Sequence, residues 1–164
     1  MNGRYQNKGE SARGGEPSLS IALAEAIDVD RDLDRQAQSK LSGKLQDAKT
    51  VALNRMGEDL EIVIAGKDLI ARWVLKKDKF ACAKGILSIQ KSASIGGDNG
   101  GLVRNIVLDV HRSEGYLVLN SHGPGAGFIL FVPIVGYESL WSRYALIPAD
   151  VRNVNGIEQR HDER

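Results

Sequence analysis

The spacing of apolar residues changes once along this chain, near Gly57. Before that glycine, apolar residues recur three and four positions apart, which is the period of one face of an α-helix. The pattern predicts one long helix from Leu33 to Met56, with Gly57 as its stop signal. A shorter helix is predicted at 18–27, with a break near Asp28. The stripe of the long helix consists of Leu33, Ala37, Leu41, Leu45, Ala48, Ala52 and Met56.

After Gly57 the apolar residues alternate with polar ones or form short continuous runs, and both patterns are typical of β-strands. Turns rich in glycine or charge separate these runs. A helical turn is predicted within 137–144, and the H-G-P-G-A-G run at 122–127 is interpreted as a connection between two strands. The predicted strands lie at 60–65, 69–75, 80–89, 102–110, 116–120 and 128–135.

Helices first and strands afterwards indicate an α+β domain. We therefore predict N-terminal helices packed on a mainly antiparallel sheet of about five to seven strands. Residues 1–17 are polar and glycine-rich, which predicts a flexible arm. Residues 18–156 form the single predicted domain, and residues 157–164 form a predicted flexible tail.

Composition adds few constraints. The 22 basic residues balance 21 acidic ones, so the whole chain has no strong preference for a charged partner. A single cysteine, Cys82, excludes a disulfide within the chain and favours a reducing compartment. No apolar run approaches the ~18 residues of a membrane span. The expected location is therefore cytoplasmic, with no membrane partner.

A hairpin is predicted around R-S-E-G at 112–115, with His111 opposite Tyr116 and Asp109 opposite Val118. Alternation then places Ile106, Leu108, Val110, Leu117 and Leu119 on one face, which we expect to be buried. The opposite face carries Asn105, Asp109, His111, Tyr116, Asn120 and His122.

Two interpretations of this polar face stay open. It is either an ordinary solvated face of an antiparallel sheet or a functional site. In the second case Asp109 orients His111 as a base, or both residues bind a metal together with His122.

Residues 43–94 contain a helical segment (S-G-K-L-Q-D-A-K-T-V-A-L-N-R-M-G), an Asp-bearing segment (G-K-D-L-I-A-R) and a strand ending in Gln and Lys (G-I-L-S-I-Q-K-S-A-S). This order resembles the restriction-endonuclease-like superfamily with its PD-(D/E)xK motif. The later segments G-F-I-L-F-V-P-I-V and R-Y-A-L-I-P-A-D-V are similar to the closing hairpin of some members. The resemblance implies a Mg²⁺-dependent nuclease.

In that resemblance Asp68 holds Mg²⁺, Gln90 completes the metal site and Lys91 positions or deprotonates the attacking water. The motif requires the acid and the lysine two residues apart, so that both side chains leave the same face of the strand. Gln90 and Lys91 are adjacent, and Ile89 stands where the acid is needed. Cleavage therefore depends on a β-bulge at Gln90.

Between residues 67 and 91 basic residues outnumber the two acids, Asp68 and Asp78. Such an excess suits a phosphate backbone, although a run of charge is commonly just a solvated surface. The leading hypothesis is a nucleic-acid-binding protein on a nuclease-like scaffold. The alternative is a non-enzymatic assembly protein that forms homo-oligomers or docks on a protein partner. The predicted nucleic-acid-binding residues are Lys67, Arg72, Lys76, Lys77, Lys79 and Lys84.

Overall fold

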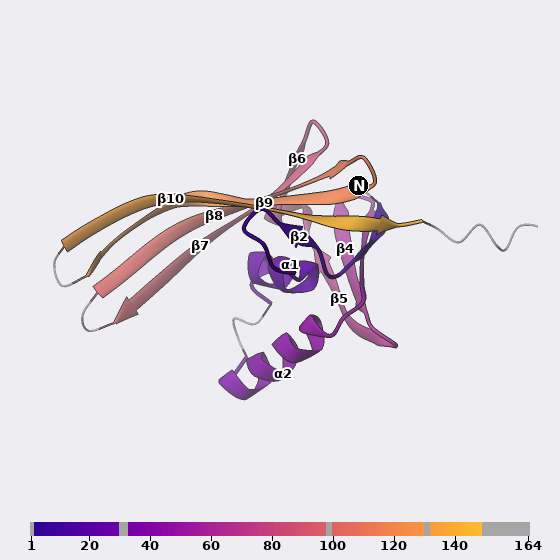
Figure 1. Cartoon of the computed structure of the whole chain (residues 1–164), viewed down its shortest axis with the longest axis horizontal. Coiled ribbons are helices and arrows are strands. Elements are labelled where there is room, and N and C mark those ends of the chain that lie inside the picture. Colours follow the sequence, from indigo (N-terminus) through magenta and orange to yellow (C-terminus); the bar gives the residue numbers. More distant parts are fainter. Residues whose placement is uncertain (1, 30–32, 98–99, 130–131, 149–164) are drawn as a thin grey trace, which may run out of the picture.

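The structure, a computed structural model of the chain, describes residues 2–29, 33–97, 100–129 and 132–148. Over these residues ten strands form one antiparallel sheet, accompanied by two α-helices and a short 3₁₀ turn (Figure 1). The elements in chain order are β1 (Gly3–Gln6), β2 (Glu10–Ser11), α1 (Leu19–Ile27), α2 (Arg35–Gln46), β3 (Thr50–Met56), β4 (Asp59–Ala65), β5 (Leu69–Leu75), η1 (Lys77–Lys79), β6 (Ala81–Ala83), β7 (Ile86–Gly97), β8 (Gly100–Ser113), β9 (Tyr116–Ile129) and β10 (Val132–Ile147).

Strand β1 lies in the middle of the sheet although it comes first in the chain. The strand order is β5-β4-β3-β1-β10-β9-β8-β7-β6, and β2 pairs with β10 beside this path. We call β3 to β5 the short-strand wing and β7 to β10 the long-strand wing. The long-strand wing extends well past α1 (Figure 1). Because β1 pairs with β3 on one side and β10 on the other, it joins the two wings.

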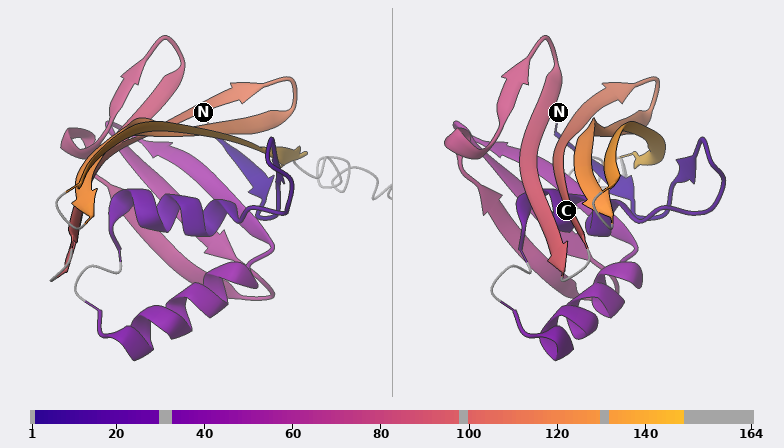
Figure 2. Two further views of the ribbon diagram at one scale, coloured as in Figure 1. Left: turned by 60° about the vertical axis from the view of Figure 1, so that its left-hand side comes forward. Right: turned by 90° about the vertical axis from the view of Figure 1, so that its left-hand side faces the viewer.

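The sheet is strongly curved, and α1 lies inside the curve, covered on both sides by strands (Figure 2). Leu19 and Leu23 of α1 are fully buried, as are the inward-facing side chains of β3 and β4. These contacts form one continuous core that runs from one wing through the helix to the other. The fully buried apolar side chains are Tyr5, Leu19, Leu23, Val51, Leu53, Ile62, Ile64, Val110, Leu117 and Tyr144.

The buried side chain of Asn7 fixes where the helices attach to the sheet. Its amide group donates to the carbonyls of Leu45 and Ala48, both at 3.0 Å, at the end of α2. Its side-chain oxygen accepts from the Ser20 backbone N–H at 2.8 Å and from the Ser18 hydroxyl at 3.3 Å, at the start of α1. Asn7 is completely buried. Asn7, which directly follows β1, therefore attaches both helices to the sheet through its side-chain hydrogen bonds.

The predicted fold class was wrong in its proportions. We expected helices packed on a sheet of about five to seven strands, whereas the described residues form a ten-stranded sheet that wraps around one short helix. The main cause is the stretch after Gln46. The apolar stripe was extended to Met56, but α2 ends at Gln46 and residues 50–56 form β3. A short apolar run fits either period, and pairing with β1 and β4 decides for the strand.

Residues 1–17 are not a detached arm over their described part. Gly3–Gln6 is the central strand, and Tyr5 is fully buried in the core. Four residues are too few to show an alternating pattern, so composition suggested a flexible segment. The break predicted near Asp28 is confirmed, because Asp28 ends α1 in the left-handed conformation at φ 59°. The predicted tail at 157–164 lies outside the described residues.

The hairpin prediction placed the correct residues on each face but assigned the wrong partners. Leu108, Val110, Leu117 and Leu119 are buried as expected. However, Ser113 rather than His111 lies opposite Tyr116. The turn consists only of Glu114 and Gly115, at φ 42° and 84°. The pairing therefore continues to Ser113, and each residue of β8 lies opposite the β9 residue two positions later than a four-residue turn predicts. A shift of two preserves the faces.

Three other segments are also strands with different boundaries. The predicted strand 80–89 is a hairpin, because Lys84 and Gly85 both have positive φ and reverse the chain between β6 and β7. The run 122–127 is not a connection but part of β9, and 137–144 is not helical but part of β10. In each case pairing with a long neighbouring strand overrides the local signal.

We predict that Asn7→Ala lowers the free energy of unfolding by about 3 kcal/mol. It removes the Asn7 donor from the Ala48 and Leu45 carbonyls and the acceptor of the Ser20 backbone N–H, and only the Leu45 carbonyl keeps another side-chain donor, the Ser20 hydroxyl. Chemical denaturation measures this loss. Asn2→Ala is the matched control, since Asn2 is exposed and accepts one hydrogen bond from the Arg55 backbone N–H at 2.8 Å. The control should lose less than about 1 kcal/mol. Equal losses in the two variants would contradict the structural role given to Asn7.

Candidate ligand-binding cavity

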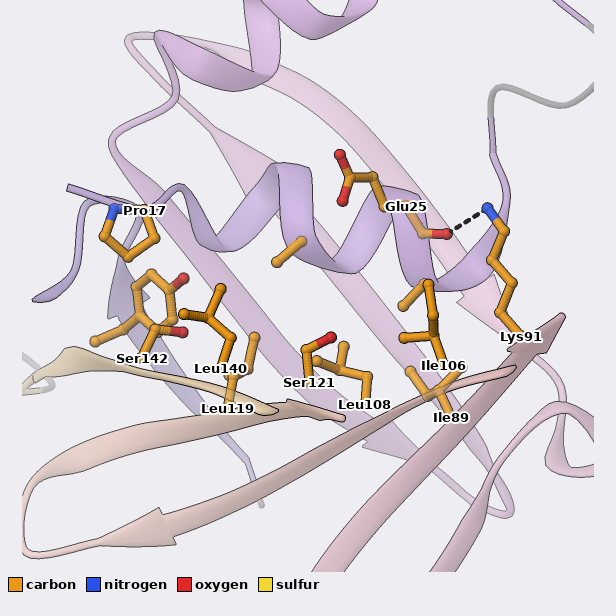
Figure 3. Close-up of a pocket in the computed structure, with 13 residues that line it drawn as sticks. Pro17, Glu25, Ile89, Lys91, Ile106, Leu108, Leu119, Ser121, Leu140 and Ser142 are labelled. Carbon is orange, nitrogen blue, oxygen red and sulfur yellow. Dashed lines mark hydrogen bonds between the residues drawn. The ribbon is translucent and has the colours of Figure 1, made fainter. Parts of the chain in front are cut away.

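A cavity of about 310 Å³ separates α1 from the concave face of the long-strand wing (Figure 3). On the sheet side its wall is formed by side chains of β7, β8, β9 and β10. On the helix side it is formed by Ala22, Glu25 and Ala26, with Pro17 before the helix. The lining residues from the sheet are Ile89, Lys91, Ile106, Leu108, Leu119, Ser121, Leu140, Ser142 and Tyr144.

The sequence of α1 explains why space remains there. Leu19 and Leu23 are one turn apart, and both are fully buried in the core. Ala22 and Ala26 are also one turn apart, on the side that lines the cavity. Positions four residues apart share a helix face, so α1 has a leucine face and an alanine face. The short alanine side chains do not reach the sheet, and the gap between them and the sheet is the cavity.

Lys91 closes one end of the cavity and holds the end of α1. Its Nζ donates to the Glu25 carbonyl at 2.8 Å and forms an ion pair with Asp28 at 2.7 Å. Figure 3 shows the Lys91 side chain reaching from β7 to the helix. A cation at a helix C-terminus is favourable because the last carbonyls carry partial negative charge. Glu25 is exposed, so the cavity reaches solvent at this end.

Tyr144, which also lines the cavity, carries a buried hydroxyl group without a partner. Tyr144 is fully buried, and its hydroxyl makes no hydrogen bond within the described structure. Burial raises the pKa of Tyr144, and the nearby Ser142 opposes that shift only in part. The chain passes tightly over the ring at Gly9, where a Cβ atom would come within 2.5 Å of the Tyr144 ring. A side chain at position 9 would therefore clash with the Tyr144 ring and with the Arg143 carbonyl.

The convex face of the same strands has a different chemistry. A chain of hydrogen bonds crosses all four strands of the wing, from Ser88 through Asp109 and His122 to Tyr137. Asp109 Oδ2 lies 3.0 Å from His122 Nε2, and His122 Nδ1 lies 3.0 Å from the Tyr137 hydroxyl. The Ser88 hydroxyl donates to the other oxygen of Asp109. The partner of Asp109 is thus His122, not His111.

Of the residues in this series of hydrogen bonds, Asp109 is the one whose pKa is clearly shifted. Partial burial by itself raises the pKa of this carboxyl, but hydrogen bonds from Ser88 and His122, with the charges of His122 and His111, lower it overall. His111 lies instead against Trp141, with an edge-to-face contact at 6.4 Å between ring centroids. Tyr137 is mostly exposed. The arrangement fits a polar network on a solvated face, one of the two interpretations that the sequence left open.

The structure does not assemble the predicted nuclease site. Asp68 lies in the connection between β4 and β5, on the short-strand wing, and Lys91 is paired with Asp28. The pairing of β7 with β8 continues without a bulge through Gln90, so Gln90 and Lys91 point to opposite faces. Among the described residues no three His, Cys, Asp or Glu side chains are grouped to hold a metal ion. These residues therefore do not fit a Mg²⁺ site.

Most of the predicted nucleic-acid-binding residues are paired with carboxylates. Arg72 lies 3.0 Å from Glu61, Lys76 lies 2.8 Å from Asp59, and Lys77 is paired with Glu58. Lys79 lies 3.5 Å from Asp78, while Lys67 and Lys84 are exposed at turns. The three lysine pairs are largely exposed, and exposed ion pairs contribute little to stability, whereas Glu61 is buried. Nucleic-acid binding and the alternative of homo-oligomer assembly both stay predictions.

The sequence analysis did not predict the cavity, and it gave two of the lining residues the wrong local structure. Tyr144 was placed in a helical turn, and Ser121 was read as one residue beyond a strand. A longer strand from Tyr116 would have put Ser121 on the face of Leu117 and Leu119 by alternation. Tyr144 reaches that face only because β10 pairs with β9 and places it opposite Leu117. Comparison with protein-family models, curated proteins and solved structures found no match. Within the described residues no helix has the length and apolar character needed to cross a membrane.

We predict that the stability gap between the wild-type protein and Asp109→Asn depends on pH. The pKa of Asp109 is lowered by folding, so its stabilising effect is full above its unfolded-state pKa of about 3.9. That effect is lost as the pH falls through the lower folded-state value. Urea denaturation between pH 7 and pH 2.5 should show the gap closing below about pH 4. The control is Asp78→Asn, because Asp78 is exposed and takes no part in the hydrogen bonds from Ser88 to Tyr137. A gap independent of pH would contradict the assignment.

A salt titration tests the nucleic-acid hypothesis. If the basic segment binds phosphates, changing Lys76, Lys77 and Lys79 to Ala should reduce the slope of log affinity against log salt by about 0.9 for each phosphate that is no longer neutralised. Fluorescence anisotropy with double- and single-stranded oligonucleotides measures this slope. Replacing Lys40 and Lys44 of α2, which are exposed and outside the segment, is the control. Absence of binding at low salt would end this hypothesis.

Proposed function

We propose that this protein binds a small, mainly apolar molecule in the cavity between α1 and the long-strand wing. The observation that carries this proposal is the enclosure of a sizeable cavity between α1 and the sheet, with mostly apolar side chains around it. Protein interiors are close-packed, with few voids larger than a water molecule. A space of about 310 Å³ corresponds to roughly ten water molecules in the liquid. It also reaches the lower limit of small-molecule sites, about 300 Å³.

The chemistry of the walls supports an apolar occupant. Leucine, isoleucine and alanine side chains supply most of the lining, and Ile89, Leu108 and Leu119 are almost completely buried. Water gains little in such a space, because an ordered water needs two to four polar partners. An apolar molecule gains about 25 cal/mol for each Å² of apolar surface removed from water. The cavity therefore favours an apolar molecule over water.

The surrounding structure keeps the cavity from closing. Hydrogen-bond ladders connect β7, β8, β9 and β10 across the whole sheet-side wall. On the other side, α1 is fixed at its start by Asn7 and at its end by Lys91. A helix held at both ends cannot move toward the sheet to fill the space. The site is thus largely formed before a ligand arrives, as is usual for small-molecule sites.

Filling the cavity should abolish binding without unfolding the protein. We predict that Ala22→Leu reduces the affinity for 1-nonanol at least tenfold, because the new side chain occupies the space of the ligand. Titration calorimetry measures the affinity, and thermal denaturation should show an unchanged or higher melting temperature. Ala37→Leu, on α2 and outside the cavity, is the matched control and should bind like the wild-type protein.

A second variant with a smaller added side chain shows whether overpacking, rather than loss of space for the ligand, causes the effect of Ala22→Leu. Ala26→Val adds less volume on the same face of α1 and should weaken binding by a smaller factor. If wild-type protein does not bind 1-nonanol, or if Ala22→Leu binds it equally well while remaining folded, the proposed function is wrong.

A further inference from the structure

We propose that the ligand of this cavity carries one uncharged hydrogen-bonding group, a hydroxyl or a carbonyl, which meets the hydroxyl of Ser121. This inference rests on the proposed function and specifies the class of molecule. It follows from three properties of the cavity: the position of Ser121, the state of its one cation, and its volume.

Ser121 is a polar residue in the middle of an apolar wall. It lies directly opposite Leu108 of β8 and Leu140 of β10 in the two strand ladders. In Figure 3 its hydroxyl rises from the sheet toward α1, between the labelled leucines. Within the described structure this hydroxyl makes no hydrogen bond to the protein. It is therefore available to a molecule in the cavity.

A free hydroxyl among leucines favours a ligand with a matching polar group. Placing a polar group in an apolar environment costs free energy unless it is hydrogen-bonded. A hydroxyl or carbonyl group on the ligand would satisfy Ser121 and leave the apolar part of the molecule against the leucines.

The charges at the cavity argue against a charged ligand. Among the described residues Lys91 is the one cation that lines the cavity, and its Nζ already contacts Asp28 and the Glu25 carbonyl. A carboxylate would have to compete with Asp28 for that ammonium group and would meet the exposed Glu25 nearby. An ammonium group at Ser121 would be desolvated among leucines. The carboxylate that lines the cavity, Glu25, is exposed to water and offers such a group only a weak, solvated partner. For either ionised group, the free-energy cost of losing its hydration therefore exceeds the free energy of the contacts that the cavity offers.

The volume limits the ligand to roughly ten non-hydrogen atoms, taking about 30 Å³ for each, the share of a water molecule in the liquid. Compounds with nine carbon atoms and one polar group match this size. The test therefore uses 1-nonanol, 2-nonanone, nonanoate and nonylammonium, which share a similar tail and differ in the polar group. Titration calorimetry at pH 7.5 gives the four affinities for the full-length protein.

The expected result is that 1-nonanol and 2-nonanone bind at least tenfold more tightly than nonanoate and nonylammonium. Ser121→Ala should weaken 1-nonanol binding about fivefold, which corresponds to one ordinary hydrogen bond. The matched control is Ser113→Ala, an exposed serine on β8 outside the cavity, and its affinity should not change.

A pair of tyrosine variants separates binding from stability. Tyr5 and Tyr144 both have buried hydroxyls without partners, but only Tyr144 lines the cavity. Tyr5→Phe and Tyr144→Phe should both leave the melting temperature unchanged or raise it, because each removes an unsatisfied polar group. Neither substitution should change the preference for 1-nonanol over nonanoate, because both hydroxyls have almost no surface that a ligand could contact.

The outcomes distinguish this inference from the proposed function. If none of the four compounds binds, the proposed function fails and the inference fails with it. If nonanoate or nonylammonium binds as tightly as 1-nonanol, the cavity is a ligand site but the inference about an uncharged group is wrong. Unchanged 1-nonanol affinity in folded Ser121→Ala overturns the role of Ser121 in the same way.

Discussion

The hydrogen bonds of the Asn7 side chain are the constraint on which the rest of this structure depends. A buried amide can be satisfied only if its donors and acceptors lie in fixed positions. Here the donors require two carbonyls at the end of α2, and the acceptor requires the first turn of α1. The Asn7 backbone also donates to the Lys49 carbonyl just before β3. One residue thus fixes both helices relative to β1, and β1 joins the two wings.

This constraint also explains how a cavity persists in a folded core. Spaces left by small side chains normally shrink as neighbouring elements relax into them. In this protein the sheet cannot move easily, because its strands are paired along their length. The helix is held at its start by the Asn7 contacts and at its end by Lys91. Ala22 and Ala26 lie between these two attachments, so the space beside them stays open.

Sequence patterns predicted the faces of this fold better than its boundaries. Alternation placed Leu108 and Leu119 in the core, and the end of α1 near Asp28 was found from its local signal. Nothing local indicated that residues 3–6 form the central strand, since that depends on pairing with residues more than forty and more than one hundred positions away. The cavity was equally inaccessible, because it results from the distance between a helix and a sheet. The absence of a bulge at Gln90 likewise depends on β8.

The two faces of the long-strand wing have complementary physical roles. The concave face is apolar and forms the cavity wall, whereas the convex face carries the chain from Ser88 through Asp109 and His122 to Tyr137. Each of these four residues comes from a different strand, so their hydrogen bonds add to the backbone ladders in fixing how the strands lie side by side. Because Ser88 and Ile89 are adjacent on β7, as Asp109 and Leu108 are on β8, strands positioned by the polar network also position the apolar side chains behind them. The positions of the side chains in the cavity wall therefore depend in part on the polar network of the convex face.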